Sequence, residues 1–349
     1  MTDTMQAAVF HGAGKPLSIE KVPVPQPGSG DVLVKVAACG FCHTDLHYLD
    51  HGVPTAKKPP LILGHETSGT VATLGPGSTR WKQGDRVLLP AVLPCGRCQA
   101  CRTGRENICA DMRMFGNHVD GGFAEYVLAP EKDLIALPPD IDLEKASIIA
   151  DALSTPYHAV VNRAQVRAGE WVAIVGCGGV GMNAVQFAAA SGANVLAIDL
   201  RDDKLDVARK LGAVETINPT RSPKEFAKDV RRITGGGADV AIEAVGSPAT
   251  IDTAFSTLRR GGRVCLIGYS EKPAELPAAK VMFFEYTIMG SLGCRPADYP
   301  RIVEMVRRGH VKLDPLVTSR TQLSQVNEAA DRLRRGEGLR SIIVPDVLR

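Results

Sequence analysis

Residues 171–191, WVAIVGCGGVGMNAVQFAAAS, decide the fold of the second half of the chain. An apolar strand-like run leads into the glycine pattern Gly176-x-Gly178-x-x-Gly181, and a helix-forming segment follows. In this arrangement the first glycine permits a tight turn, the second lets the backbone approach a pyrophosphate, and the third lets the helix pack closely on the strand. Free N–H groups at the helix N-terminus favour anions. The segment therefore predicts a dinucleotide-binding turn.

The next strand-like run, NVLAID, ends in Asp199, which lies eighteen residues beyond Gly181. An acidic side chain at this place can accept hydrogen bonds from the adenosine ribose and repel a 2′-phosphate. This favours NAD over NADP. Arg201 is close enough to soften the discrimination, and the alternative is that Asp199 merely ends a strand.

From Trp171 onward, short apolar strands alternate with amphipathic helices in the rhythm of a parallel sheet. The predicted strands are WVAIV, NVLAID, ETIN, DVAIEAVG, RVCLIG and YTIMGS, and the predicted helices cover about 182–191, 203–211, 223–233 and 249–258. After them, the amphipathic helix PADYPRIVEMVRRG and the strand-like SIIVP no longer alternate. We therefore expect the tail to return to the first domain.

The first half, from Met5 to about Pro138, reads as short β segments broken by Gly and Pro: AAVF, DVLVKVAA, GTVATLG, DRVLLP and FAEYVLAP. A chain of 349 residues exceeds the usual size of one domain, so two domains are expected.

The composition is that of an ordinary globular protein with a formal charge of +3 and no long run of Lys or Arg. Neither a nucleic acid nor a membrane surface is implied as a partner, and a small molecule suits the chain better. The sequence shows no secretory leader and no apolar run of membrane-spanning length, so a cytoplasmic protein with reduced cysteines is expected.

Residues 42–66, CHTDLHYLDHGVPTAKKPPLILGHE, gather a cysteine, several histidines and a carboxylate around turns that contain Pro and Gly. A loop of this kind can bring soft and borderline ligands to one cation. We interpret the loop as part of a catalytic zinc site. The alternative is that Cys42 and His65 are ordinary semi-buried residues.

Four further cysteines are packed into PCGRCQACRTGRENIC, at positions 95, 98, 101 and 109. Four closely spaced thiolates without a helix or strand pattern between them fit a closed tetrahedral zinc site that ties down a lobe with little core of its own. Because Cys95, Cys98, Cys101 and Cys109 would fill all four positions, this zinc should be structural. A redox-active thiol cluster is the alternative.

In combination, the motifs CGFCHTDLH, GHETSGTV, the cysteine lobe and GCGGVG resemble those of the zinc-dependent alcohol dehydrogenases of the medium-chain dehydrogenase/reductase family, over essentially the whole chain. The resemblance implies an α/β protein with two domains. A GroES-like β-rich catalytic domain, completed by the C-terminal tail, would comprise residues 1–152 and 291–349. A Rossmann domain with a doubly wound parallel sheet, residues 153–290, would bind NAD. A homodimer or homotetramer is also implied, with the strand near YTIMGS available for pairing.

The resemblance also implies roles around a catalytic zinc. Cys42 and His65 match ligands, and Glu66 matches a carboxylate beside the metal. Asp151 stands where many members carry a further cysteine ligand, and its oxygen can take that place. A helix N-cap is the alternative role of Asp151. On residues 44–47, Thr44 would bind the alcohol, Asp45 would hold a ligand in orientation, and His47 would end a proton relay.

Cofactor contacts are implied in the same way. His43 and Arg340 match positions near the pyrophosphate, and Thr155 matches one near the nicotinamide. The remaining expected contacts are the turn glycines Gly176, Gly178, Gly179 and Gly181, with Val180, Asp199, Lys204, Val245, Ile267 and Leu292.

The reaction implied is the transfer of a hydride between NAD(H) and a primary or secondary alcohol or its carbonyl partner. Ala91 falls where relatives often carry a large aromatic, which suggests a substrate bulkier than ethanol. Tyr48, Leu49, Phe115 and Leu292 are further candidates for the pocket lining, and any of them can instead be core. Three alternatives are a dehydrogenase of cyclic hydroxyacyl-CoA compounds, a zinc-free enone or quinone reductase, and an NADH-sensing zinc-binding protein.

Overall fold

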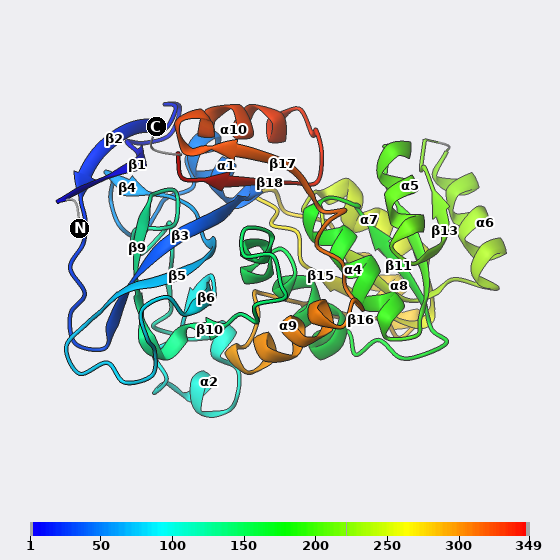
Figure 1. Ribbon diagram of the computed structural model, residues 1–349. Helices are drawn as coiled ribbons and strands as arrows, with labels where there is room; N and C mark the ends of the chain where they lie inside the picture. Colours follow the sequence, from blue (N-terminus) through cyan, green and yellow to red (C-terminus); the bar gives the residue numbers. More distant parts are fainter. Residues whose placement is uncertain (1–2, 221, 347–349) are drawn as a thin grey trace. The chain divides into compact units, whose positions relative to one another are not determined.

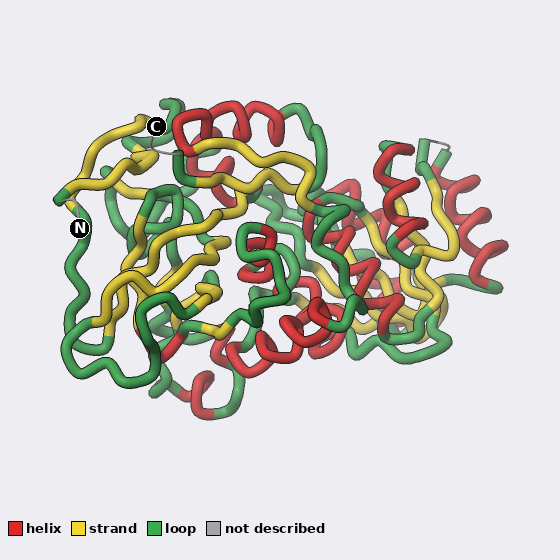
Figure 2. Tube along the Cα trace, in the orientation of Figure 1, coloured by secondary structure: helices red, strands yellow, loops and turns green. Residues whose placement is uncertain are grey.

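A computed structural model describes residues 3–220 and 222–346 of the chain (Figures 1 and 2). The chain divides into two compact units. The first comprises Met1–Ala152, Cys294–Arg307 and Leu313–Arg349, and the second comprises Leu153–Gly293 and Arg308–Lys312.

The first unit is built mostly from β-strands, as the broken β segments of the sequence predict. Its main sheet has the order β10 (Ile135–Ala136), β6 (Arg86–Leu89), β5 (Glu66–Leu74), β3 (Asp31–Phe41), β18 (Arg340–Val344) and β17 (Val317–Gln322), and β9 (Tyr126–Pro130) also pairs with β3. A second sheet has the order β2 (Ser18–Pro23), β1 (Thr4–Phe10) and β4 (Leu61–Ile62), and a small ribbon joins β7 (Val92–Leu93) to β8 (Arg113–Met114).

The tail of the chain belongs to the first unit. Strand β18, dark red in Figure 1, runs antiparallel to the blue strand β3, with Ser341 opposite Phe41. Strand β17 pairs with β18, and the helices α9 (Tyr299–Arg307) and α10 (Val326–Arg334) lie in the same unit. The expectation that the tail returns to the first domain is confirmed.

One local expectation for the first unit is wrong. We predicted a loop at the start of residues 42–66, but His43–Asp50 form helix α1. The helix buries Leu46, Tyr48 and Leu49 against the core, where the rings of Phe41 and Phe123 stack with centroids 5.3 Å apart. Apolar positions spaced at one helical turn explain why these residues form a helix despite the turn-rich sequence after them.

The second unit contains a six-stranded sheet in which each strand pair is parallel. Its order is β13 (Ala213–Ile217), β12 (Asn194–Ile198), β11 (Trp171–Val175), β14 (Ala238–Glu243), β15 (Leu258–Leu266) and β16 (Thr287–Gly290). The order reverses between β11 and β14, as in a doubly wound dinucleotide fold. All six strands predicted for this half are present.

Helices connect these strands: α4 (Gly179–Ala190), α5 (Asp202–Lys210), α6 (Pro223–Thr234), α7 (Pro248–Thr257) and α8 (Ala278–Phe283). The start of α6 carries a local sequence signal for a helix, because Ser222 and Glu225 form a reciprocal capping box. A helix after Asp151, implied by the N-cap alternative, is present as the short α3 (Ser154–Tyr157), but the sequence did not predict the π-helical turn His158–Arg163 that continues it. Within the described residues, no helix is both long and apolar enough to cross a membrane.

Candidate active site

Cys42 is held at the N-terminus of α1 by its neighbour Asp45. Asp45 Oδ2 accepts a hydrogen bond of 2.9 Å from the Cys42 N–H, and the Asp45 side chain is fully buried. An acidic residue in the first turn also suits the helix dipole. The thiol of Cys42 is therefore placed by the backbone geometry of a helix start.

The glycine of the GHE motif positions His65. Gly64 has a φ of +94°, and a Cβ at this position would come within 2.7 Å of the Phe123 ring and 2.8 Å of Cys39 Sγ. Only glycine fits such a tight left-handed position. His65 follows it with 1% of its surface exposed, and its Nδ1 lies 3.8 Å from Asp45 Oδ1.

Cys42, His65, Glu66 and Asp151 converge in the first unit. One ligand atom from each lies within 4.8 Å of every other, and His65 Nε2 is 3.5 Å from Asp151 Oδ2. Both ring nitrogens of His65 and both carboxylate oxygens of Glu66 are buried without a hydrogen-bond partner among the described residues. Buried polar groups are nearly always satisfied, so a missing partner here fits a bound cation. The donors, one sulfur, one imidazole and carboxylate oxygens, are those that zinc accepts.

Asp151 is not the N-cap of the helix that follows it. It lies at the end of the 3-10 helix Lys145–Ala150 with φ −142°, and Leu153 is the N-cap of α3. The side chain of Asp151 is 20% exposed. One oxygen of its carboxylate, Oδ2, lies 3.5 Å from His65 Nε2.

Glu66 shares its buried position with Arg340. Arg340 Nη2 lies 3.5 Å from Glu66 Oε1, and Arg340 Nη1 donates a 3.0 Å hydrogen bond to the Phe41 carbonyl. A Cβ on Gly40 would overlap the Glu66 carboxylate, so this glycine leaves the room that the carboxylate needs. Burial raises the pKa of Glu66 to about 7, against the opposing effect of the Arg340 charge.

The charges around His65 set its protonation. Burial disfavours the imidazolium, but the neighbouring acidic groups of Asp151, Cys42 and Asp45 together raise the pKa of His65 well above 6.5. Burial likewise raises the pKa of Asp45 above 3.8. Such a set of opposed shifts in one buried cluster is typical of a functional site.

The remaining residues predicted on this stretch lie on α1. Thr44 is half-buried, with Oγ1 3.8 Å from Cys42 Sγ. His47, one turn further on, is also half-buried, and His43 is exposed. Sequence reasoning missed His51, whose Nδ1 lies 3.2 Å from His47 Nδ1. The spacing of four residues in HTDLHYLDH was a signal that could have revealed the pair.

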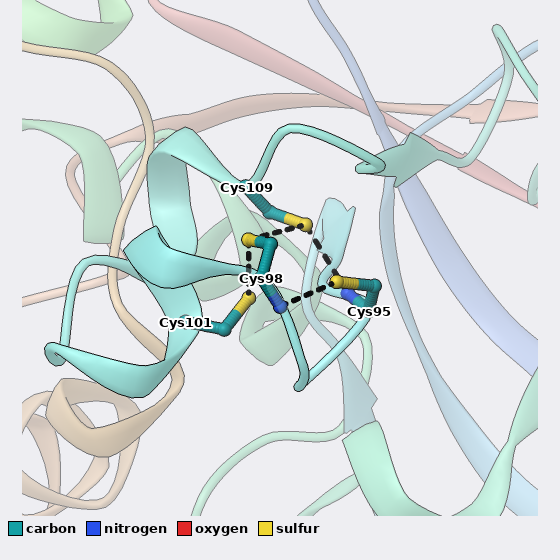
Figure 3. A group of neighbouring side chains, drawn as sticks. All are labelled: Cys95, Cys98, Cys101 and Cys109. Atoms are coloured by element: carbon teal, nitrogen blue, oxygen red, sulfur yellow. Dashed lines mark hydrogen bonds between the residues drawn. The ribbon is translucent and has the colours of Figure 1, made fainter.

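The cysteine lobe forms a second cluster, shown in Figure 3. All nine cysteines of the chain are free, and the sulfurs of Cys95, Cys98, Cys101 and Cys109 all lie within 4.8 Å of one another. Cys98 Sγ is 3.5 Å from Cys101 Sγ and 3.8 Å from Cys109 Sγ. Four sulfurs bound to one tetrahedral zinc lie about 3.8 Å apart, given a Zn–S bond of about 2.3 Å. The lobe therefore fits a structural zinc.

The lobe also favours the thiolate form at one position. Backbone N–H donors lower the pKa of Cys98 to about 6. Burial and its neighbours Cys98 and Cys109 raise the pKa of Cys101 to about 12. Negative charge on one sulfur thus opposes ionisation of the next, and a bound dication would remove that conflict.

The glycine-rich turn has the geometry that its sequence predicts. Gly176 has a φ of +90°, and a Cβ on Gly181 would overlap the Gly176 carbonyl, so strand and helix can approach this closely only with glycine. A Cβ on Gly178 would meet nothing within 4 Å. Space is thus left beside the N-terminus of α4, where a pyrophosphate can approach the backbone.

Asp199 is fixed at the end of β12. Its Oδ2 accepts a 2.7 Å hydrogen bond from the Cys177 N–H in the glycine-rich turn, and its Oδ1 accepts a 3.0 Å bond from the Arg201 N–H. The guanidinium of Arg201 forms two hydrogen bonds of 3.0 and 2.9 Å with Asp203. The carboxylate is thereby held at the turn.

The other predicted cofactor contacts follow the carboxyl ends of neighbouring strands, where ligands bind in open α/β sheets. Val245 follows β14, Ile267 follows β15 and Leu292 follows β16; Gly179, Val180 and Lys204 are half-buried at the starts of α4 and α5. Thr155 is on α3 with 8% of its surface exposed. Sequence reasoning missed Glu243, a buried acid at the end of apolar β14 that accepts 2.9 Å bonds from the Val245 and Gly246 N–H groups.

Most candidates for the substrate pocket are buried in the first unit. Ala91 is 4%, Tyr48 5%, Leu49 2% and Phe115 1% exposed, and the Tyr48 hydroxyl accepts a hydrogen bond from Asn117. Leu292, in the second unit, is 52% exposed. Leu49 and Phe115 therefore serve the core, whereas Leu292 is open to a ligand.

Comparison with known proteins places this geometry in a family. Residues 28–139 match the alcohol dehydrogenase GroES-like domain and residues 179–308 match the zinc-binding dehydrogenase domain. An alcohol dehydrogenase of Rhizobium meliloti (strain 1021) is 39% identical over 335 residues, 96% of each chain. The chain belongs to the zinc-type medium-chain alcohol dehydrogenases.

Solved structures agree with this placement. The alcohol dehydrogenase of Aeropyrum pernix has a TM-score of 0.89 and 36% identity, and the match covers 97% of this chain and all of that one. A protein from Sinorhizobium meliloti 1021 bound to NADP has a TM-score of 0.89 and 31% identity, with 99% and 100% coverage. The GroES-like and Rossmann folds are confirmed, and the chain is an oxidoreductase of this family. These relatives do not favour the zinc-free, sensor or acyl-CoA alternatives.

Proposed function

We propose that the protein is a zinc-dependent NAD(H) alcohol dehydrogenase that interconverts a primary or secondary alcohol bulkier than ethanol and its aldehyde or ketone. The observation that carries the proposal is the buried convergence of Cys42, His65, Glu66 and Asp151 next to Thr44 on α1. The side-chain nitrogens of His65 and oxygens of Glu66 have no hydrogen-bond partner among the described residues.

In this proposal Cys42, His65 and Asp151 hold the catalytic zinc, and Glu66 lies beside it. The thiolate and the Asp151 carboxylate together balance the charge of a dication, and Asp45 orients His65 through its Nδ1. When bound, the zinc supplies a Lewis acid with an open position, which makes an alcohol hydroxyl more acidic. A second zinc is held by the four cysteines of the lobe and is structural.

Thr44 and His47 are the residues through which the proton of the substrate hydroxyl is transferred. The Thr44 hydroxyl, beside Cys42, accepts a hydrogen bond from the substrate hydroxyl and orients it. His47 lies one turn further along α1 and is half-buried, so its imidazole can pass a proton between the site and solvent. No covalent intermediate with the protein is required.

The geometry of the second unit supports NAD over NADP. The carboxylate of Asp199 is held at the glycine-rich turn by the Cys177 N–H, and the charge of Arg201 is directed to Asp203. The Asp199 carboxylate would therefore repel a 2′-phosphate, and the pairing of Arg201 with Asp203 would weaken the compensating attraction. When bound at the glycine-rich turn, NAD(H) would supply the hydride chemistry, and the residues of the second unit would position it.

Substrate size rests on a single small residue. Ala91 precedes β7, and by the family resemblance it stands where relatives often carry a large aromatic. A large alcohol is therefore the expected substrate class, and small molecules are the only partners proposed apart from further copies of the chain. The edge strand β16 exposes Ile288 at 37%, which suits pairing of cofactor domains in a dimer or tetramer.

One experiment tests the proposal as a whole. A panel of primary and secondary alcohols of increasing bulk is screened with NAD and with NADP, by nicotinamide absorbance, and zinc is measured on the same sample. We expect two zincs per chain, turnover with NAD and better activity on bulky alcohols. Firm NADH binding without turnover of any alcohol would refute the enzymatic proposal.

A further inference from the structure

Helix α1 carries a pair of histidines at its C-terminal end. His47 and His51 are four residues apart, so their side chains lie on the same face of the helix. A hydrogen bond of 3.2 Å joins their Nδ1 atoms, and the ring centroids are 5.3 Å apart with an interplanar angle of 60°. His47 is half-buried and His51 is exposed, so solvent ions can reach the pair.

The nitrogen separation matches that of two ligands of one metal ion. Two imidazole nitrogens bound to a tetrahedral zinc lie about 3.3 Å apart, given Zn–N bonds of about 2.0–2.1 Å. The two rings are tilted, and their Nδ1 atoms face each other across a distance close to this value. A cation would replace the shared hydrogen bond, and the two nitrogens already have the separation that one ion spans.

The backbone that carries the two rings is firmly held. At the start of α1, Asp45 accepts from the Cys42 N–H, and near its end Asp50 accepts hydrogen bonds of 2.7 and 2.8 Å from Arg334 on α10. The N–H of His51 donates to the His47 carbonyl over 3.3 Å. A preorganised pair of ligands loses less conformational entropy on binding than two independent side chains.

We propose that His47 and His51 form a binding site for a borderline divalent cation, with free Zn²⁺ as the ligand in solution, separate from the cysteine-containing clusters. Neutral imidazole is a common donor for zinc, and water can fill the positions that the pair leaves open. With two protein ligands this site binds zinc more weakly than the four thiolates do, so it responds to free zinc while the lobe stays loaded.

Occupancy of this site would slow the reaction. This consequence rests on the proposed function, in which His47 passes a proton to solvent. A cation on His47 Nδ1 occupies the lone pair of that nitrogen, and the other ring nitrogen then carries the N–H, so no basic nitrogen is left near neutral pH. Zinc binding itself does not depend on the relay role.

The test uses the zinc-loaded enzyme after removal of excess metal. Equilibrium dialysis against increasing free Zn²⁺ measures bound zinc per chain, and turnover is followed in the same solutions. His51→Gln removes one ligand and leaves every residue of the proposed reaction in place. His310→Gln, at another exposed histidine, is the matched control.

We expect one additional zinc per chain and a parallel loss of turnover that brief chelation reverses. His51→Gln should retain turnover without added zinc and should lose both the additional zinc and the inhibition, whereas His310→Gln should retain both. No additional zinc, or an additional zinc that persists in His51→Gln, would overturn the site. Binding that depends on His51 but leaves turnover unchanged would support the site and contradict the relay role of His47.

Discussion

His65 Nε2 and Asp151 Oδ2 lie 3.5 Å apart in the first unit, which joins the GHE motif to a carboxylate far along the chain. The imidazole of His65 is buried and has no hydrogen-bond partner among the described residues. Asp151 is the acid that stands where a cysteine ligand is expected. An oxygen donor in place of sulfur keeps the charge balance of the site, so we propose Asp151 as a zinc ligand.

Asp151→Cys should keep a functional catalytic site, because a thiolate carries the same charge and is an accepted zinc donor. We expect the variant to retain two zincs per chain and part of its turnover. Metal content and initial rates with NAD measure this. Loss of one zinc in Asp151→Cys would argue that the site needs the reach of a carboxylate.

Cys101→Ser should remove the structural zinc, because the lobe then offers three thiolates and a weak hydroxyl donor. With the metal lost, the lobe loses its main support, and we expect the melting temperature to fall by roughly 5 °C or more. Calorimetry and limited proteolysis between Cys95 and Cys109 check this. Arg102→Ala, at an exposed neighbour, is the control and should change neither zinc content nor stability.

Asp199→Ala should shift cofactor preference toward NADP. Removal of the carboxylate relieves repulsion of a 2′-phosphate and loses contacts to the ribose, so the ratio of kcat/KM for NADP over NAD should rise by about tenfold or more. Asp206→Ala, an exposed acid on α5, serves as the control. If the parent enzyme already uses NADPH as well as NADH, the assignment of Asp199 fails.

His47→Gln should lower kcat by about tenfold or more near neutral pH, because a relay end is lost while binding residues remain. KM for the alcohol should change little, which separates a proton-transfer defect from a structural one. Added imidazole should restore part of the rate. Unchanged kcat with an unchanged pH profile would exclude His47 from the relay.

Much of the fold follows from local patterns in the sequence. The glycine turn and the alternation from Trp171 onward predicted all six strands of the second sheet, because each pattern follows from backbone chemistry over a few residues. Helix α1 was missed because Pro and Gly after Gly52 masked an eight-residue helix whose apolar side chains are few. The π-helical turn His158–Arg163 depends on packing and has no local signature.

The candidate site was only partly visible from residues 42–66. Cys42 and His65 both lie within this stretch, so the local motif was enough to suggest them. Asp151 was assigned by resemblance, and its contact with His65 joins residues far apart in the sequence. Arg340 likewise meets Glu66 only because β18 pairs with β3. The His47–His51 contact was readable from spacing, but its nitrogen separation required side-chain coordinates.

The zinc content of Asp151→Ala tests the central claim most directly. The variant is purified beside the parent enzyme, and zinc per chain is measured together with turnover. We expect two zincs per chain for the parent and one for the variant, which keeps its lobe metal and loses turnover. Two zincs per chain in Asp151→Ala, with turnover retained, would show that Asp151 is not a ligand of the catalytic zinc.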